Sequence, residues 1–231
     1  MFLQEEWKGT YIKIQTLFKR DEKTHKIIYG DYSKQEFPNI KLYSISEKVD
    51  GTNIRITFEN NNIKFDGKTD DAQIPARLYS VLQKRFTVDI LKNTFIMDKA
   101  VIQQDGIEKI EKVLPNKIIL FGEGYGAKIH KGGGSYSADP KFILFDAWID
   151  GWWIERNNIA DIAKKLDIKY VPEIGLMTIE EAINYVKSSP NSLIAESSRM
   201  MEGIVARSHP LMLFRVGTPI IWKLKVKDFK E

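Results

Sequence analysis

The chain of 231 residues contains no cysteine, which removes several kinds of site at once. Disulfides, thiolate metal sites and cysteine nucleophiles are all excluded. The sequence also lacks an apolar run close to the roughly 20 residues that a membrane-spanning helix needs. The N-terminus carries Glu5 and Glu6 and lacks the basic-then-apolar order of a secretory signal. These absences favour a cytoplasmic protein that does not contact a membrane.

No internal repeat, low-complexity tract or linker rich in proline, glycine and serine divides the sequence. With 43% hydrophobic residues, the chain is large enough to bury a substantial core. We therefore expect one domain over residues 1–231, with a helical subregion at 150–200. The formal net charge of +4 is compatible with a polyanionic partner, but many enzymes without such a partner have similar values.

Strand and helix signals are mixed along the chain. Residues 53–58 alternate apolar and polar side chains, which predicts a strand with one buried face. Further strands are expected at residues 42–46, 117–121, 141–148, 203–207 and 219–226, and helices at residues 74–93, 107–113, 159–166 and 178–187. Thr178 and Glu181 form a capping-box pattern at the start of the last helix. Because strands and helices do not alternate regularly, the expected fold class is α+β, an antiparallel sheet with flanking helices.

The most informative segment has the pattern Lys-x-Asp-Gly-x-Asn, with Lys48, Asp50, Gly51 and Asn53 at its fixed positions. A lysine two residues before a tight turn, at the mouth of an apolar strand, suits an amine that bonds covalently to a nucleotide phosphorus. Attack needs the neutral amine, so nearby cations or a divalent metal would have to favour that form. Taken alone, the pattern fits an ordinary surface lysine before a turn better.

A lysine stripe follows the strand expected near the C-terminus. Period two places Lys223, Lys225 and Lys227 on one face, opposite apolar side chains such as Trp222. Such a stripe can contact phosphate, but lysines also protect exposed edge strands from aggregation. Without other motifs, the two interpretations are evenly balanced.

Three further segments place carboxylates or aromatic rings beside apolar strands. Residues 121–126 lead into a glycine-rich, basic loop, where Glu123 can accept from a sugar hydroxyl or reach a metal through water. Asp146 follows Phe145 inside an apolar strand, where a carboxylate without partners would be costly. Glu202 begins another apolar strand and is the strongest candidate for a metal-linked carboxylate. Each segment also has an ordinary interpretation, such as a glycine-rich hairpin or a core aromatic.

In their order and spacing, these segments resemble the motifs of the covalent nucleotidyltransferase superfamily. They resemble most closely the ATP-dependent RNA ligases of the bacteriophage nick-sealing type. The segments that carry the resemblance are Lys48-x-Asp50-Gly51-x-Asn53, Phe121-Gly122-Glu123-Gly124, Phe145-Asp146, Glu202-Gly203 and Lys223-Leu224-Lys225. The upstream segment 13–20, the loop 124–134, and Asn53 where DNA ligases usually have arginine also resemble RNA ligases. The resemblance runs from about Tyr11 to Lys227, and the motifs together are specific although each alone is weak.

The resemblance implies an antiparallel-sheet adenylation domain with an ATP-grasp-like ligase core. It also implies a reaction in three steps. Lys48 attacks ATP to form lysyl-AMP and releases pyrophosphate, AMP moves to a 5′-phosphate end, and a 3′-hydroxyl then attacks the activated end. ATP and Mg²⁺ (or Mn²⁺) are the implied cofactors. The implied partner is RNA with 5′-phosphate and 3′-hydroxyl ends, such as a nicked duplex, in RNA repair in the cytoplasm (the host cytoplasm for a phage protein).

The resemblance assigns roles to individual residues. The implied catalytic set, with Lys48 as nucleophile, is Lys48, Lys223, Lys225, Glu202 and Asp50. The implied nucleotide-binding set is Glu47, Lys48, Val49, Asn53, Arg55, Lys68, Glu123, Phe145, Glu202, Lys223 and Lys225. Within it, Glu123 contacts the ribose, Phe145 stacks on adenine, and Glu47 meets the adenine edge through its backbone. Glu202, Asp50 and Glu123 would hold the metal through water.

The chain departs from the family pattern at two places. The family usually has an arginine in the short motif after the nucleophile, where this chain has Lys68, which cannot give a planar bidentate fork. The sequence also ends soon after the lysine stripe, so no C-terminal accessory or OB domain is expected. Grip on the substrate would then come from the basic loop 128–134, the helical subregion or a partner protein.

Other functions stay open at this point. A minimal DNA ligase and a GTP-dependent mRNA capping enzyme share the same motifs. A non-catalytic nucleic-acid-binding module with this fold would be expected to lose the nucleophile or the phosphate-binding lysines. Lys48, Lys223 and Lys225 are all present, which disfavours that alternative.

Overall fold

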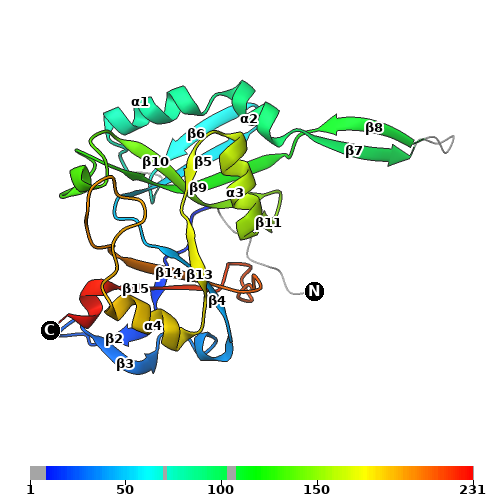
Figure 1. The fold of residues 1–231 in the computed structure, drawn as a ribbon. Helices are drawn as coiled ribbons and strands as arrows, with labels where there is room; N and C mark the ends of the chain where they lie inside the picture. Colours follow the sequence, from blue (N-terminus) through cyan, green and yellow to red (C-terminus); the bar gives the residue numbers. More distant parts are fainter. Residues whose placement is uncertain (1–8, 70–71, 103–107, 231) are drawn as a thin grey trace. The chain divides into compact units, whose positions relative to one another are not determined.

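The computed structural model describes residues 9–69, 72–102 and 108–230 (Figure 1). Their elements are mainly antiparallel strands with helices beside them, and this confirms the expected α+β class. None of the helices in these residues is long and apolar enough to cross a membrane.

The contacts of the chain divide it into two compact units. Unit 1 comprises Met1–Gly51, Tyr125–Asp139 and Val171–Glu231, and unit 2 comprises Thr52–Gly124 and Pro140–Tyr170. The chain first leaves unit 1 directly after the Asp50-Gly51 turn, so Lys48 belongs to unit 1 and the strand that follows it belongs to unit 2. The expected single domain over residues 1–231 stays a prediction.

Unit 1 is built on a five-stranded sheet in the order β1-β15-β14-β4-β13. Its strands are β1 (Gln15–Thr16), β15 (Ile221–Lys225), β14 (Gly203–Ser208), β4 (Tyr43–Glu47) and β13 (Glu173–Met177). Strand β14 pairs antiparallel with both β15 and β4, whereas β1 pairs in parallel with β15. Trp222 is fully buried in the core of this unit and meets the ring of Tyr43 edge-on, with 5.1 Å between centroids. Aromatic pairs of this kind contribute both buried area and a specific geometry.

A hairpin, one helix and short helical turns complete unit 1. They are β2 (Phe18–Arg20), β3 (Ile27–Tyr32), α4 (Ile179–Lys187), η1 (Phe37–Asn39), η2 (Gly133–Ser135) and η3 (Val226–Phe229). The predicted capping box of α4 is confirmed, because the Thr178 hydroxyl accepts from the Glu181 N–H at 3.3 Å and the Glu181 carboxylate accepts from the Thr178 N–H at 2.8 Å.

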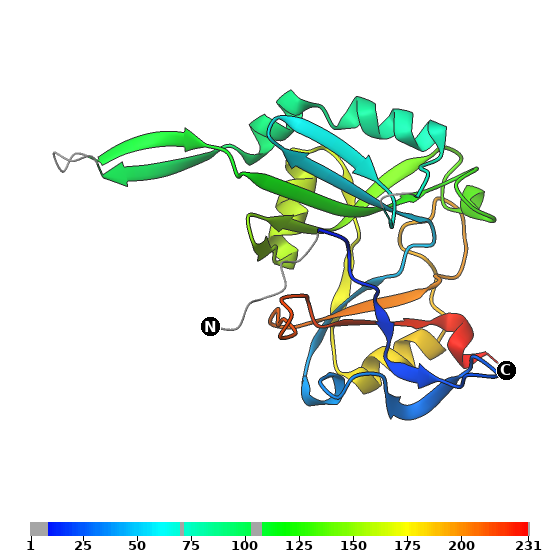
Figure 2. The same cartoon turned by 180° about the vertical axis from the view of Figure 1, so that it is seen from behind.

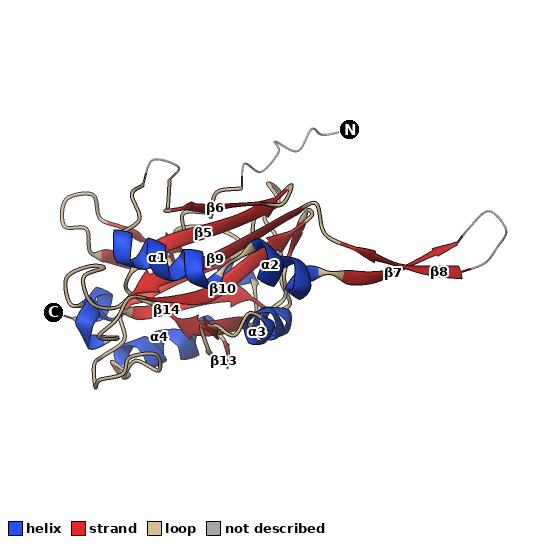
Figure 3. Cartoon of the chain, turned by 90° about the horizontal axis from the view of Figure 1, so that it is seen from above, coloured by secondary structure: helices blue, strands red, loops and turns tan. Residues whose placement is uncertain are grey.

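Unit 2 is built on a second sheet, in the order β11-β10-β9-β5-β6, with β12 pairing in parallel with β10. The strands are β5 (Thr52–Glu59), β6 (Asn62–Asp66), β9 (Lys117–Tyr125), β10 (Lys141–Ile149), β11 (Trp152–Trp153) and β12 (Lys169–Tyr170). The helices are α1 (Ala76–Arg85), α2 (Val88–Phe95) and α3 (Arg156–Lys165), and Figure 3 shows α1 and α2 along this sheet. The predicted alternation in β5 is confirmed for Ile54, Ile56 and Phe58, which are all buried.

The helix predicted over residues 74–93 is divided into α1 and α2. Thr87 takes an extended backbone between them, and its hydroxyl accepts from the Ile90 N–H at 3.3 Å, capping α2. Phe86 is buried beside it and meets the ring of Phe142 edge-on, with 5.4 Å between centroids. The sequence has no glycine or proline at this break, so the helical spacing of apolar residues predicted one continuous helix. The burial of Phe86 and the cap at Thr87 end the first helix and start the second.

The helix predicted over residues 107–113 is wrong for 108–113; Ile107 lies outside the described residues. Residues Glu108–Val113 form β8, paired with β7 (Met97–Ile102) in a hairpin that extends away from the sheet of unit 2 (Figure 2). Opposite charges face each other across the hairpin, Asp98 with Lys112 and Lys99 with Glu111. Such cross-strand pairs favour strands where the sequence alone allowed a helix.

The lysine stripe is shorter than predicted. Trp222 and Leu224 are buried while Lys223 and Lys225 face the other way, as expected from period two. Strand β15 ends at Lys225, because the Asp228 carboxylate accepts from the Lys225 N–H at 3.0 Å and turns the chain into η3. Lys227 therefore lies on an exposed helical turn and does not continue the stripe, which corrects the prediction.

The packing of β14 against β15 predicts the effect of one added methyl group. A Cβ at Gly203 would overlap the backbone of Leu224 and Lys225, which cannot move away as a flexible side chain can. Gly203→Ala is therefore expected to lower the free energy of unfolding by about 1–3 kcal/mol. Urea unfolding followed by circular dichroism measures this change.

Gly134→Ala is the matched control, because the atom nearest its added Cβ would be the Ala127 Cβ at 3.9 Å. It should unfold close to the wild type. Equal stability of the two variants would contradict the tight contact at Gly203.

Candidate active site

Three charged side chains meet in unit 1 at the ends of three strands. Lys48 follows β4, Glu202 precedes β14, and Lys225 ends β15. The Lys48 Nζ lies 2.5 Å from Glu202 Oε2, and the Lys225 Nζ lies 2.5 Å from Glu202 Oε1. One carboxylate thus bridges two lysines, of which one lies 154 residues before it and the other 23 residues after it in the sequence. We call this group the Lys–Glu–Lys cluster.

The register of the sheet explains why these side chains meet. Gly203 lies opposite Lys225 in the β14–β15 ladder, and Ile204 lies opposite Glu47 in the β14–β4 ladder. The Lys48 N–H continues this pairing beyond β4 and donates to the Gly203 carbonyl at 2.8 Å. Glu202 is therefore held by backbone pairing between the two lysines.

The cluster is partly shielded from water, with side-chain exposures of 22% for Lys48, 17% for Glu202 and 23% for Lys225. Burial alone would raise the pKa of Glu202, but the two lysines favour its charged form and hold that pKa below its usual value. Two cations around one anion leave an excess positive charge, which suits a phosphate group. Lys223 lies two residues before Lys225 on the same face of β15.

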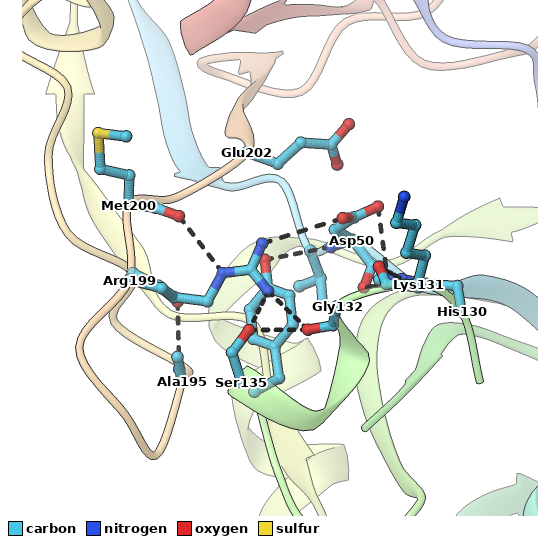
Figure 4. A network of polar contacts seen from close by, with 12 residues as sticks. Asp50, His130, Lys131, Gly132, Ser135, Ala195, Arg199, Met200 and Glu202 are labelled. Carbon is cyan, nitrogen blue, oxygen red and sulfur yellow. Dashed lines mark hydrogen bonds and ion pairs between the residues drawn. The ribbon is translucent and has the colours of Figure 1, made fainter. Parts of the chain in front are cut away.

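The Asp50 turn is held by the glycine-rich loop of residues 126–136 (Figure 4). The Asp50 N–H donates to the Tyr136 hydroxyl at 3.3 Å, and the Asp50 carbonyl accepts from His130 Nε2. The other ring nitrogen of His130 lies 2.7 Å from the Lys131 carbonyl. Because both ring nitrogens face carbonyl oxygens, both can donate only in the imidazolium form. Burial would lower the pKa of His130, but these carbonyls and the Asp50 charge raise it above its usual value.

Glu47 has a structural role on the other side of the nucleophile. Its side chain is only 2% exposed and accepts from the Ser192 hydroxyl at 2.5 Å and from the Leu193 N–H at 2.7 Å. Burial raises the pKa of Glu47 despite these hydrogen bonds. The side chain thus anchors the segment before Glu202, and contact of the Glu47 backbone with adenine stays a prediction. Val49, also in the predicted set, is buried.

The remaining predicted residues belong to unit 2. Asn53 in β5 lies opposite Glu123 in β9, so the ladder brings these two together. Arg55 is buried, and its guanidinium forms an ion pair with Asp66 of the same unit at 3.0 Å. Phe145 is half-buried in β10, while Lys68 is exposed after β6. Their assignment to the nucleotide stays a prediction.

Asp146 follows Phe145 in β10 and is buried, with 1% exposure. Its carboxylate accepts from the Ala147 N–H at 3.0 Å. The expectation that a carboxylate in this strand would have a partner is therefore confirmed.

No three histidine, aspartate or glutamate side chains converge on a metal-binding position among the described residues. Carboxylates such as Glu202 are suitable donors for Mg²⁺. Here, however, both oxygens of Glu202 are paired with lysines, so a metal at Glu202 would require those side chains to move. The predicted metal set of Glu202, Asp50 and Glu123 stays a prediction.

Sequence reasoning did not single out Arg199, Ser192 or Tyr136. Arg199 contacts the Asp50 network, and Ser192 binds Glu47. Ser192 and Arg199 lie in a segment with little regular structure and no periodic pattern. Its position directly before Glu202 was the one feature of the sequence that pointed to a role in the site.

The mainly antiparallel sheets, with a lysine at a strand end and two lysines nearby, are of the nucleotidyltransferase type. The family model described as RNA ligase matches residues 41–225, which is most of the sequence. The chain belongs to the RNA ligase family. No curated protein sequence matches it.

Solved structures of an RNA ligase from Naegleria gruberi are similar in fold. One, determined with pyrophosphate, has a TM-score of 0.57 at 13% identity and covers 94% of this chain and 55% of that chain. An apo point variant has a TM-score of 0.60 at 13% identity, with the same coverage. A variant with ATP and Mn has a TM-score of 0.57 at 15% identity and covers 95% of this chain and 62% of that chain. This chain therefore spans little more than half the length of the Naegleria protein.

The lowered pKa of Glu202 predicts a pH-dependent contribution to stability. Because the pKa of Glu202 is lower in the folded protein, its ionised carboxylate contributes to the free energy of unfolding at pH values above the usual carboxyl pKa. That contribution is lost as the pH falls through the pKa of the folded state. Glu202→Gln should lower the free energy of unfolding at pH 7 by about 1–3 kcal/mol, because two lysines lose their counterion. The deficit should narrow as the pH falls toward 3, which urea unfolding across pH measures.

Glu59→Gln is the control, since Glu59 pairs with Lys117 at 3.3 Å on an exposed surface. It should change stability by less than about 1 kcal/mol. A deficit for Glu202→Gln that is independent of pH would contradict the charge-based account.

Proposed function

We propose that this chain is an ATP-dependent RNA ligase that forms lysyl-AMP on Lys48. The observation that carries the proposal is the Lys–Glu–Lys cluster, with Lys48 2.5 Å from Glu202 in a chain of the RNA ligase family. A related fold has been determined with ATP and Mn, and another with pyrophosphate, which are a substrate and a product of such a step.

In the first step, the Lys48 ammonium loses a proton to water, and the neutral nitrogen attacks the α-phosphorus of ATP and releases a second proton as the new bond forms. A nitrogen–phosphorus bond forms, the bond from that phosphorus to the bridging oxygen breaks, and pyrophosphate leaves. Lys225 and Lys223 stabilise the negative charge that develops on the phosphate, as preorganised cations do in a partly shielded site. Glu202 orients Lys48 and Lys225 through its two oxygens.

A bound Mg²⁺ or Mn²⁺ would neutralise phosphate charge, and Glu202, Asp50 and Glu123 are the residues that would hold it through water. By their positions in the family motifs, Glu123 would contact the ribose and Phe145 would stack on the adenine. The later steps transfer AMP to a 5′-phosphate and join that end to a 3′-hydroxyl, releasing AMP.

The proposal predicts that the chain labels itself with ATP through one lysine. Wild-type protein incubated with ATP labelled at the α-phosphate should carry the label through a denaturing gel, and Lys48→Ala should carry none, because no amine remains to form the bond. Lys227→Ala is the control, since this nearby lysine lies on an exposed turn, and it should label like the wild type.

A Lys48→Ala variant that still became labelled would remove Lys48 from the mechanism. Labelling of the wild type by GTP but not by ATP would favour the capping reaction over ligation.

The end chemistry gives a second prediction. RNA with a 5′-phosphate and a 3′-hydroxyl should be joined, and RNA with a 5′-hydroxyl should not. Gel electrophoresis of labelled strands measures the joined product. Self-labelling without any joining across single strands, nicked duplexes and hybrids would contradict ligation and leave only nucleotidyl transfer.

A further inference from the structure

Arg199 lies between α4 and β14, three residues before Glu202, and reaches into the network around Asp50 (Figure 4). Its Nη1 donates to the Ser135 hydroxyl at 2.7 Å and to the Gly132 carbonyl at 3.4 Å. Its guanidinium lies over the Tyr136 ring, 4.0 Å from the centroid. One side chain thus contacts three residues of the glycine-rich loop.

The same guanidinium also faces Asp50. Its Nη2 lies 3.9 Å from Asp50 Oδ2, a separation that gives ionic attraction rather than a direct hydrogen bond. The Tyr136 ring beneath Arg199 carries the hydroxyl that accepts from the Asp50 N–H. Arg199 therefore acts on Asp50 by two routes, through its carboxylate and through the ring that holds its backbone.

The chemistry of arginine suits this position. A planar guanidinium can stack on a ring while its N–H groups donate in the plane, which a lysine ammonium cannot do. The Arg199 side chain is 21% exposed, so its ionic attraction is less screened than at an open surface. None of the family motifs in the sequence includes this residue.

We infer that Arg199 is a positioning residue for the adenylation step, which rests on the proposed function. Arg199 holds the glycine-rich loop next to the Asp50 turn, and these contacts fix the backbone two residues after Lys48. Small displacements of a nucleophile reduce the rate strongly, because the reacting atoms must stay aligned. Arg199 does not touch the reacting atoms, and its effect passes through Asp50.

A double-mutant cycle on the full chain tests this route, using Arg199→Ala, Asp50→Asn and the double variant. The readout is the rate of self-labelling by ATP at saturating concentration. Arg199→Ala should lower the rate about tenfold, within the range for coupled contacting residues. The apparent KM for ATP and the Tm should stay near the wild-type values. In the Asp50→Asn background, where only the carboxylate route is removed, Arg199→Ala should lower the rate by a smaller factor than it does in the wild type. Arg199→Lys should restore only part of the rate.

Arg215→Ala is the matched control, an exposed arginine of unit 1 in the β14–β15 connection, and it should label like the wild type. Effects of Arg199→Ala and Asp50→Asn that multiply would overturn the inference, as would an unchanged rate or a change confined to KM.

If the wild type takes no label from ATP, the proposed function fails. Amide hydrogen exchange then tests the contacts of Arg199 independently of activity. Arg199→Ala should increase the exchange rates at Asp50 and in residues 132–136 and leave the exchange rates in β5 unchanged. Unchanged exchange at those amides would overturn the inference.

Discussion

The pairing of β14 with β4 on one side and with β15 on the other is the constraint on which the charged cluster depends. Lys48, Glu202 and Lys225 each lie at the end of a strand, and the ladders place those ends side by side. Gly203 permits the approach, because a side chain there would meet the backbone of β15. The cluster is stable because the carboxylate offsets the repulsion between two lysines that the sheet holds close together.

The nucleophile candidate is fixed on both sides by hydrogen bonds, through the carboxylate of Glu47 on one side and through the backbone of Asp50 on the other. Glu47 before it binds Ser192 and Leu193, and Asp50 after it is bound by the glycine-rich loop. The short segment between them therefore has little freedom, although it lies outside any helix or strand. A preorganised segment of this kind loses less entropy when substrate binds, which is how positioning contributes to rate.

Patterns in the sequence predicted the features that residues close together in the chain determine, such as the alternation of a strand and the cap of a helix. The alternation in β15 correctly separated Trp222 from Lys223, and the Thr178 capping box marked the start of α4. The contact of Lys48 with Glu202 spans 154 residues and depends on strand register, which no local pattern encodes, so only the family resemblance linked them. No sequence pattern predicted the role of Arg199, because this residue lies in an irregular segment whose path depends on contacts with distant residues. The error at β8 has a similar cause, since pairing with β7 decided between two conformations that the sequence allowed.

Strand β15 is paired on both edges, with β1 and with β14, and from Trp222 to Lys225 its side chains alternate between the buried core and the face that carries Lys223 and Lys225. This makes the strand sensitive to a change in length as well as to a change in side chain. Deleting one residue between Ile221 and Lys225 would shift the alternation, turning buried positions outward and lysines into the core. A pair of deleted residues would keep the faces but break the register with Gly203. The spacing between Trp222 and Lys225 therefore tolerates replacement better than insertion or deletion.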